Sequence, residues 1–421
     1  MIDFEVTPTQ KVVNPTIKVV CVGGAGGNTG NAMIESGCTD IECIAVNTDA
    51  QALNLSKAPI KIQIGMKSTK GLGTGADPLV GRRAAEEDLD KVMEAIGQAD
   101  IVFLTGGMGG GTGSGVIPII AKALKERNIL TITIVTKPFE FEGKRRCRVA
   151  EEIVKQLESL TDTLIVIPNQ KLLAVCDVHM AMIDAFGMIN QVLSQSVRAI
   201  SDIITRPGHI NVDYADVRTI MKDRGIAVMG TGKASGKDRA EMASLQAISS
   251  PLLENMHIEG AHAVLLNITG NKTLTLDELS KAASIVYEAA HEDANIILGT
   301  VIDESLKDEV MITIIATGFE KQQTKQIMMQ EEKGAYQSYT IHNAPKQEVQ
   351  VQAAQKGSEE VNHKEVAIES HFTSNVSEIV HHQSSACMEF NEQRDTIGKS
   401  EIEDLDIPTF LRNKKNNEYT V

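Results

Sequence analysis

The stretch GGMGGGTGSG (106–115) contains seven glycines in ten positions, with one threonine, one serine and no charged residue. It follows the apolar run IVFL (101–104) and precedes the helix-like run VIPIIAKALKERN (116–128). A glycine-rich turn between a strand and a helix lets backbone N–H groups approach phosphate oxygens, and the helix N-terminus adds partial positive charge. Thr112 and Ser114 would add hydroxyl donors. The stretch therefore predicts a phosphate-binding loop, with close packing of the backbone as the structural alternative.

Two further glycine-rich stretches occupy similar places in the chain. GGAGGNTG (23–30) follows the strand-like run IKVVCV (17–22) and precedes the helix-like run NAMIESG (31–37). KGLGTGAD (70–77) also precedes a helix-like run. Two such loops at strand–helix junctions indicate one polyphosphate held from two sides, and the third loop could close over its outermost phosphate.

Short β-branched runs alternate with helix-periodic runs around these loops, which predicts a parallel sheet with crossover helices. The first set of strand-like runs covers residues 17–22, 41–46, 101–104, 129–135 and 163–168. Residues 179–204 keep apolar side chains at helical spacing without proline, so we expect one long helix that joins two domains. A second set of strand-like runs, 226–230, 263–268, 295–302 and 310–318, predicts a smaller α/β domain that ends near Phe319.

Composition limits the class of protein. With 421 residues, of which 42% are hydrophobic, the chain can form two domains and additional segments. A formal net charge of −15 argues against nucleic acid as a partner. The six cysteines form no CxxC pair, which favours a reduced, cytoplasmic protein. No run reaches the roughly 18 apolar residues that span a bilayer, so we expect any membrane contact to be indirect.

The last hundred residues have a different composition. Residues 320–400 are rich in glutamine, serine, glutamate and histidine, which predicts a flexible linker. Within it, His381 and His382 are expected to be solvated, although a histidine pair is able to bind a metal. The end of the chain, 401–421, becomes locally apolar again and predicts a short docking peptide, with a frayed terminus as the alternative.

Two common nucleotide-binding motifs are absent. The dinucleotide fingerprint needs a third glycine five residues after the first, but Thr29 stands there counting from Gly24, and Thr112 counting from Gly107. The P-loop needs Ser or Thr after glycine-lysine, but Lys233 is followed by Ala234. A dinucleotide-dependent oxidoreductase is therefore disfavoured, although glycine loops after strands and Asp49 after the second strand support it.

The stretch 106–115 resembles the signature loop of the tubulin/FtsZ superfamily of GTPases, and within it the FtsZ family of bacterial cell-division proteins. Other segments carry the same resemblance: GGAGGNTGNAM, AVNTDAQAL, GLGTGADP, KPFEFEGKRR, DTLIVIPN, INVDYADVRTIM, AISSPLLE and the terminal DLDIPTFLR. The resemblance covers about residues 17–319 and the last peptide. It implies GTP and GDP binding, GTP hydrolysis with Mg²⁺ and stimulation by K⁺, head-to-tail polymerisation into filaments, and a cytoplasmic ring at the mid-cell division site.

Pattern and resemblance together predict an α/β fold with a Rossmann-like parallel-sheet GTPase domain, a long central helix and a smaller α/β C-terminal domain. The expected divisions are a flexible N-terminus (1–16), the GTP-binding domain (17–178), the central helix (179–204), the C-terminal domain with the catalytic loop (205–319), a disordered linker (320–400) and the docking peptide (401–421).

The resemblance also implies roles for single residues. Contacts to the phosphates and the sugar are implied for Gly23, Gly24, Gly26, Gly27, Asn28, Asn47, Asp49, Gly75, Ala76, Gly109, Gly110, Gly111, Thr112, Gly113, Ser114, Glu142, Arg146 and Asn169. On the long helix, Phe186 would stack on the base and Asn190 would read its edge, since an amide offers guanine both a donor and an acceptor. Without the resemblance, ordinary core packing is the simpler interpretation of Phe186.

The segment INVDYAD (210–216) places two carboxylates, Asp213 and Asp216, at the start of a helix. On position alone, Asp213 is an N-cap and Asp216 interacts favourably with the helix dipole. The resemblance implies instead that they act on the nucleotide of the next subunit by positioning a water, with Asn211 fixing the geometry. A filament protein that binds GTP without efficient hydrolysis is a further alternative, which these carboxylates disfavour.

The terminal peptide resembles the segment by which this family docks on membrane-tethering, FtsA-like adaptors. The implied partner contacts are Ile407, Pro408, Phe410, Leu411 and Arg412.

Overall fold

The computed structural model describes residues 15–38, 41–172, 180–206, 208–253 and 258–319. The predicted linker (320–400), the docking peptide (401–421) and all but the last two residues of the predicted N-terminal segment (1–16) lie outside the described residues.

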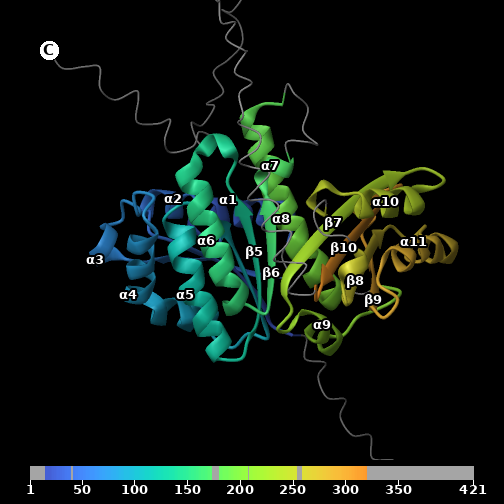
Figure 1. The fold of residues 1–421 in the computed structure, drawn as a ribbon, viewed down its shortest axis with the longest axis horizontal. Helices are drawn as coiled ribbons and strands as arrows, with labels where there is room; N and C mark the ends of the chain where they lie inside the picture. Colours follow the sequence, from blue (N-terminus) through green and yellow to red (C-terminus); the bar gives the residue numbers. More distant parts are fainter. Residues whose placement is uncertain (1–14, 39–40, 173–179, 207, 254–257, 320–421) are drawn as a thin grey trace, which may run out of the picture. The chain divides into compact units, whose positions relative to one another are not determined.

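Within the described residues, ten strands form one sheet in the order β3–β2–β1–β4–β5–β6–β7–β10–β8–β9, and Figure 1 labels its strands from β5 onward. The strands are β1 (Ile17–Val22), β2 (Glu42–Asn47), β3 (Ile60–Gln63), β4 (Ile101–Gly107), β5 (Leu130–Lys137), β6 (Thr163–Pro168), β7 (Gly225–Ser235), β8 (Ala263–Gly270), β9 (Asn295–Ile302) and β10 (Glu309–Thr317). Neighbouring strands from β3 to β7 pair in parallel, β10 is antiparallel to both of its neighbours, and β9 is parallel to β8. The predicted α/β class with a mostly parallel sheet is confirmed.

The described helices connect these strands. They are α1 (Gly23–Glu35), α2 (Ala50–Asn54), α3 (Met66–Thr69), α4 (Pro78–Ile96), α5 (Thr112–Glu126), α6 (Lys144–Leu160), α7 (Asn169–Leu172), α8 (Met182–Thr205), α9 (Tyr214–Met221), α10 (Arg239–Ile248) and α11 (Leu276–Ala289). None of these helices is long and apolar enough to cross a membrane.

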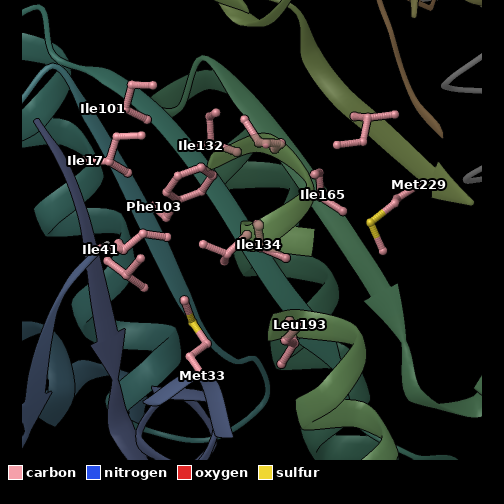
Figure 2. Packing of buried hydrophobic residues seen from close by; sticks show 14 of the residues in the cluster. Ile17, Met33, Ile41, Ile101, Phe103, Ile132, Ile134, Ile165, Leu193 and Met229 are labelled. Carbon is pink, nitrogen blue, oxygen red and sulfur yellow. The ribbon is translucent and has the colours of Figure 1, made fainter. Parts of the chain in front are cut away.

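Strand side chains pack on both faces of the sheet, which explains the continuous apolar runs. Val19 and Cys21 of β1 join the cluster beneath α1, α8 and α9, while Val20 and Val22 join the cluster beneath α4, α5 and α6. Figure 2 shows part of the first cluster. It extends from β1 through Leu193 of α8 to β7, β8 and β10. On this face of the sheet, the strands up to β6 and the strands from β7 onward therefore share one hydrophobic cluster. A third cluster lies beneath α10 and α11.

The two halves of the sheet meet at β6 and β7. Only three residue pairs join these strands, from Thr163 opposite Gly225 to Ile165 opposite Ala227. Thr163 Oγ1 also donates to the carbonyl of Met221 at the end of α9. The long helix α8 is bonded to the sheet beyond this junction, where Asn267 Nδ2 of β8 donates to the carbonyl of Ala199 at 2.8 Å.

Candidate functional site

The two main glycine-rich stretches meet at the carboxyl edge of the parallel strands. A Cβ atom added to Gly23, at the start of α1, would lie 3.3 Å from both Thr112 Cβ and Gly113 N, at the start of α5. Neither helix has an acidic residue in its first turn or a side-chain cap at its N-terminus. The partial positive charges of two helix ends are therefore adjacent and are not offset by a carboxylate.

The prediction of a loop at 23–30 was wrong, because α1 already begins at Gly23. Gly26 and Gly30 serve close packing of this helix on the sheet. A Cβ atom at Gly26 would lie 2.6 Å from the carbonyl oxygen of Thr105, and one at Gly30 would lie 2.8 Å from Cys21 Sγ. Gly24 and Gly27, in contrast, have no neighbouring atom within 4 Å of such a Cβ. Some glycines of this stretch therefore allow α1 to pack closely on the sheet, and others leave open space beside the start of the helix.

The stretch 106–115 divides in the same way. Its first two residues end β4, Met108–Gly111 form the turn, and α5 begins at Thr112. Gly113 is packed so closely that a Cβ would lie 2.3 Å from the carbonyl oxygen of Gly107, whereas Gly110 faces open space. The buried Ser114 accepts a hydrogen bond from the N–H of Gly109 at 2.9 Å, so its oxygen shapes the turn.

A second loop, Asn47–Asp49, is fastened to these turns. Asn47 is buried and its Oδ1 accepts the N–H of Asp49 at 3.1 Å, while Asp49 caps α2 by accepting the N–H of Gln51 at 2.8 Å. Thr48 and Thr112 share a hydrogen bond between their hydroxyl oxygens at 2.7 Å. Sequence reasoning missed Thr48, although it lies inside the motif AVNTDAQAL.

The third glycine-rich stretch packs beside the second loop. The N–H of Ala50 donates to the carbonyl of Gly71 at 3.0 Å. Gly75 and Ala76 are exposed and both have a positive φ, which is costly for alanine. Asp77 then caps α4 by accepting the N–H of Leu79 at 2.8 Å. Sequence reasoning missed this cap, although an aspartate followed by proline at a helix start is a recognisable signal.

The predicted sugar contacts lie beside the turn of 106–115. A Cβ atom at Gly109 would lie 2.6 Å from the carbonyl oxygen of Arg146, which places the start of α6 against this turn. Arg146 Nη1 is 2.7 Å from Glu142 Oε2, and Glu142 Oε1 accepts the N–H of Phe139 at 3.0 Å. The charge of Arg146 is therefore partly neutralised and its carboxylate partner is held in place.

Three predicted residues come from α7 and α8. Asn169 is buried, and its Oδ1 has no hydrogen-bond partner among the described residues. A buried acceptor without a donor is costly, which indicates that a ligand or water satisfies it. Phe186 is half-buried and meets the buried Phe139 edge to face, with ring centroids 5.6 Å apart. Asn190 lies one turn further along α8 and is half-buried. Phe186 thus has both a core contact and remaining exposure.

The acidic loop, residues 208–216, lies at the amino ends of the parallel strands, opposite the carboxyl ends that lead to the glycine-rich turns; it leads into α9 in Figure 1. Tyr214 OH, at the start of α9, donates to the carbonyl of Asp100 at 3.1 Å, and Asp100 immediately precedes β4. The glycine turn follows the other end of β4, which at about 3.3 Å per residue is roughly 20 Å away. Asp213 and Asp216 are therefore not brought together with the glycine loops of their own chain.

The acidic side chains are exposed. Asp213 is the N-cap of α9, since its Oδ1 accepts the N–H of Asp216 at 2.8 Å. Asn211 is also exposed, and its Oδ1 accepts the N–H of Gly208 at 2.8 Å. The described part of the chain contains no group of three or more His, Cys, Asp or Glu side chains able to hold a metal ion.

A separate cavity of about 460 Å³ lies between α4, α5 and α6. It shares only Ser114 and Gly115 with the glycine-rich stretch and is lined mainly by helix side chains such as Leu89, Pro118 and Ile153. None of the other predicted nucleotide contacts lines it, so the edge of the sheet remains the candidate site.

Comparisons with known proteins give a consistent result. The chain matches the tubulin/FtsZ family, GTPase domain, over residues 16–177 and the FtsZ family, C-terminal domain, over residues 225–320. Among solved structures it is similar to an empty FtsZ dimer from M. jannaschii, with 40% identity, a TM-score of 0.70, and coverage of 73% of this chain and 89% of that one.

More distant similarities concern the fold alone. CetZ2 from Haloferax volcanii, in a GTPγS-bound protofilament, has 21% identity and a TM-score of 0.62. The match covers 77% of this chain and 100% of that chain. CetZ1 from the same organism, a GDP-bound monomer, has 21% identity and a TM-score of 0.65. The match covers 76% of this chain and 99% of that chain.

Proposed function

We propose that this chain, which belongs to the tubulin/FtsZ family of GTPases, assembles head to tail and hydrolyses GTP between successive subunits in bacterial cell division. The family match excludes the alternative of a dinucleotide-dependent oxidoreductase. The 40% identity to an FtsZ, against 21% to the CetZ proteins, supports the division role over that of a CetZ-like relative.

The carboxyl edge of the sheet would hold the nucleotide. Gly24, Gly27 and Gly110 leave open space beside two uncapped helix N-termini, where backbone N–H groups stabilise phosphate oxygens. The hydroxyl of Thr112 adds a donor near the same place. Mg²⁺ would take most of its ligands from the phosphates and water, as this ion commonly does beside substrate phosphates, and K⁺ would add to charge neutralisation.

The guanosine would lie against α8. The exposed part of Phe186 offers a face for stacking, and the amide of Asn190 offers both a donor and an acceptor to guanine. Asn169 supports this placement because its buried Oδ1 has no hydrogen-bond partner among the described residues and a sugar hydroxyl would supply a donor. Glu142 and Arg146 would contact the sugar and phosphate from the other side.

Hydrolysis would require the next subunit, and the single observation that carries this proposal is the separation of the two halves of the site by the length of β4. Head-to-tail stacking places one subunit's acidic loop against the nucleotide of its neighbour. Asp213 uses Oδ1 to cap α9, which leaves Oδ2 and the exposed carboxylate of Asp216 to orient the attacking water.

The proposed ring at mid-cell would depend on a membrane tether. The apolar residues Ile407, Pro408, Phe410 and Leu411, with Arg412, would dock on an FtsA-like adaptor. This peptide lies outside the described residues.

Removal of the acidic charges tests the shared site. Asp213→Asn keeps a good N-cap while removing the charge, so it separates catalysis from helix stability, and Asp213→Ala removes both. We expect both variants, and Asp216→Ala, to bind GTP with wild-type affinity and to lose nearly all turnover. Equilibrium nucleotide binding and steady-state phosphate release are the measurements. Wild-type turnover in Asp213→Asn or Asp216→Ala would count against the assignment.

A further inference from the structure

We propose that Thr300, in β9, is a positioning residue for GTP hydrolysis because its hydroxyl holds the acidic loop in its catalytic shape. This inference rests on the proposed function of that loop. Thr300 lies far along the chain from Asn211 and Asp213, and β9 is at the end of the sheet with β8 as its only strand neighbour among the described strands. The open side of β9 is where the loop attaches.

Three hydrogen bonds join Thr300 to the loop. Thr300 Oγ1 accepts the N–H of His209 at 2.9 Å and the N–H of Ile210 at 2.8 Å. The N–H of Thr300 donates to the carbonyl of Ile210 at 3.0 Å. The Thr300 side chain is only 2% exposed, so its hydroxyl is a fixed acceptor shared by two consecutive backbone donors.

Packing on both sides leaves the loop little freedom. A Cβ atom at Gly208 would lie 1.7 Å from the carbonyl oxygen of Thr300, so only glycine allows this approach. At Gly299, the preceding residue of β9, a Cβ would lie 2.9 Å from Cγ2 of Val212, which is buried. The loop therefore lies close against β9 at Gly208 and at Val212, on either side of Ile210.

These anchors determine how the polar side chains are presented. Asn211 stands between the Thr300 bonds and the buried Val212, and the N–H of Gly208 fixes its Oδ1. Asp213 follows Val212 directly and is the N-cap of α9. If the hydroxyl of Thr300 is lost, the N–H groups of His209 and Ile210 lose their shared acceptor and the turn shifts. Misplacement of reacting groups by about 1 Å is enough to cost roughly a hundredfold in rate.

The experiment compares three variants of the full chain. Thr300→Val keeps the shape of the side chain without the hydroxyl, and Thr300→Ser keeps the hydroxyl without the methyl group. Thr269→Val in β8 is the matched control, since it removes a buried hydroxyl whose partner is Asn267 in its own strand. Turnover per polymerised subunit, the KM for GTP, nucleotide affinity and melting temperature are measured for each.

We expect Thr300→Val to lower kcat by about ten- to a hundredfold with unchanged affinity for GTP, whose site lies at the other edge of the sheet. Thr300→Ser and Thr269→Val should keep kcat within about twofold. A purely structural role would lower the melting temperature or the amount of polymer without changing turnover per polymerised subunit. Wild-type kcat in Thr300→Val, or an equal loss in Thr300→Ser, would overturn the inference.

Two additional variants complete the test. Gly208→Ala pushes the loop away from Thr300 from the opposite side, and it replaces Thr300→Val if that variant does not fold; wild-type kcat in Gly208→Ala would then overturn the inference. Asp213→Asn is measured in parallel. If Asp213→Asn keeps its turnover, the proposed function itself fails. If Asp213→Asn is inactive while Thr300→Val is fully active, only the role of Thr300 fails.

Discussion

Individual glycines at the carboxyl edge of the sheet have two different roles. Gly26 and Gly113 allow backbone segments to approach more closely than any Cβ permits, whereas Gly24, Gly27 and Gly110 border open space. The composition of the two stretches indicates a phosphate-binding turn, but it does not separate these roles, because the neighbour of each glycine comes from a distant part of the chain. Thr105, for example, is the packing partner of Gly26.

Two alanine substitutions separate the roles. Gly26→Ala should lower the free energy of unfolding by about 1–3 kcal/mol, because its Cβ would overlap the carbonyl of Thr105. Gly110→Ala should leave stability within about 0.5 kcal/mol, since its surroundings are open, yet weaken GTP binding at least tenfold by filling space needed by phosphate. Chemical denaturation and equilibrium GTP binding measure the two effects. Unchanged GTP affinity in Gly110→Ala would place the phosphates elsewhere.

The roles of single side chains are partly predictable from the sequence. Asp213 was recognised from the sequence as a potential N-cap, and the hydrogen bond from the N–H of Asp216 confirms that alternative. The hydroxyl of Ser114 is predicted to donate to a phosphate; its oxygen also accepts the N–H of Gly109, a second role that the sequence does not indicate. Thr300 could not be identified from the sequence, because nothing local distinguishes it from the other threonines of the strands.

Among the elements, the buried strands were the easiest to predict. Continuous apolar runs indicated β1, β4, β5 and β6 because both of their faces are covered. The edge strand β3, with sequence IKIQ, was missed since its side chains are only partly buried and it lacks such a run. The start of α1 was missed because glycine is a poor helix former, and its use in this helix depends on tertiary packing.

Helix α4 contains a local irregularity with a measurable consequence. Asp88 leaves helical geometry, with φ −125° and ψ 20°, and its buried carboxylate accepts the N–H of Gly65 at 2.7 Å and pairs with Lys91 at 2.5 Å. Burial alone would raise the pKa of Asp88, but the hydrogen bonds from Lys91 and Gly65 outweigh it, so the pKa lies below its ordinary value. This carboxylate fastens the start of α3 to α4.

The lowered pKa of Asp88 predicts a pH dependence of stability. Because its pKa is lower in the folded state, its contribution is complete above the unfolded-state value of about 3.9 and is lost as pH falls through the folded-state value. Asp88→Asn should lower the free energy of unfolding at pH 7 by about 1–3 kcal/mol and flatten its decline below about pH 4. Asp90→Asn, on the exposed face of the same helix, is the control. An unchanged acid profile in Asp88→Asn would contradict this role.

The part of the chain from α8 to β10 supports the acidic loop. The loop is bonded to β9 through Thr300, and α8, which leads to it, is tied to β8 by the bond from Asn267 to Ala199 and to Asp303 by Arg198 at 4.0 Å. The proposed nucleotide contacts, apart from those on α7 and α8, come from turns and the first turns of helices between β1 and α6. The division into a GTP-binding domain (17–178), a central helix (179–204) and a C-terminal domain with the catalytic loop (205–319) remains a proposal.

The opposite placement of the two half-sites could not be derived from sequence pattern. Strand and helix runs predict the parallel sheet, and parallel strands place the loops after β1, β2 and β4 at one edge. The position of Asp213 depends on how α8 crosses the sheet and where Tyr214 meets Asp100, which are long-range contacts. From the sequence, only the family resemblance indicates that the acidic loop acts on a neighbouring subunit.

The most direct test of the shared active site is the turnover of GTP per subunit over a wide dilution series of the full chain, with polymer mass followed by light scattering. In the proposed function one chain supplies the nucleotide site and its neighbour supplies Asp213 and Asp216, so turnover per subunit should rise steeply with concentration and fall toward zero where polymer disappears. Turnover per subunit that stays constant on dilution, in a preparation that remains monomeric, would contradict the account.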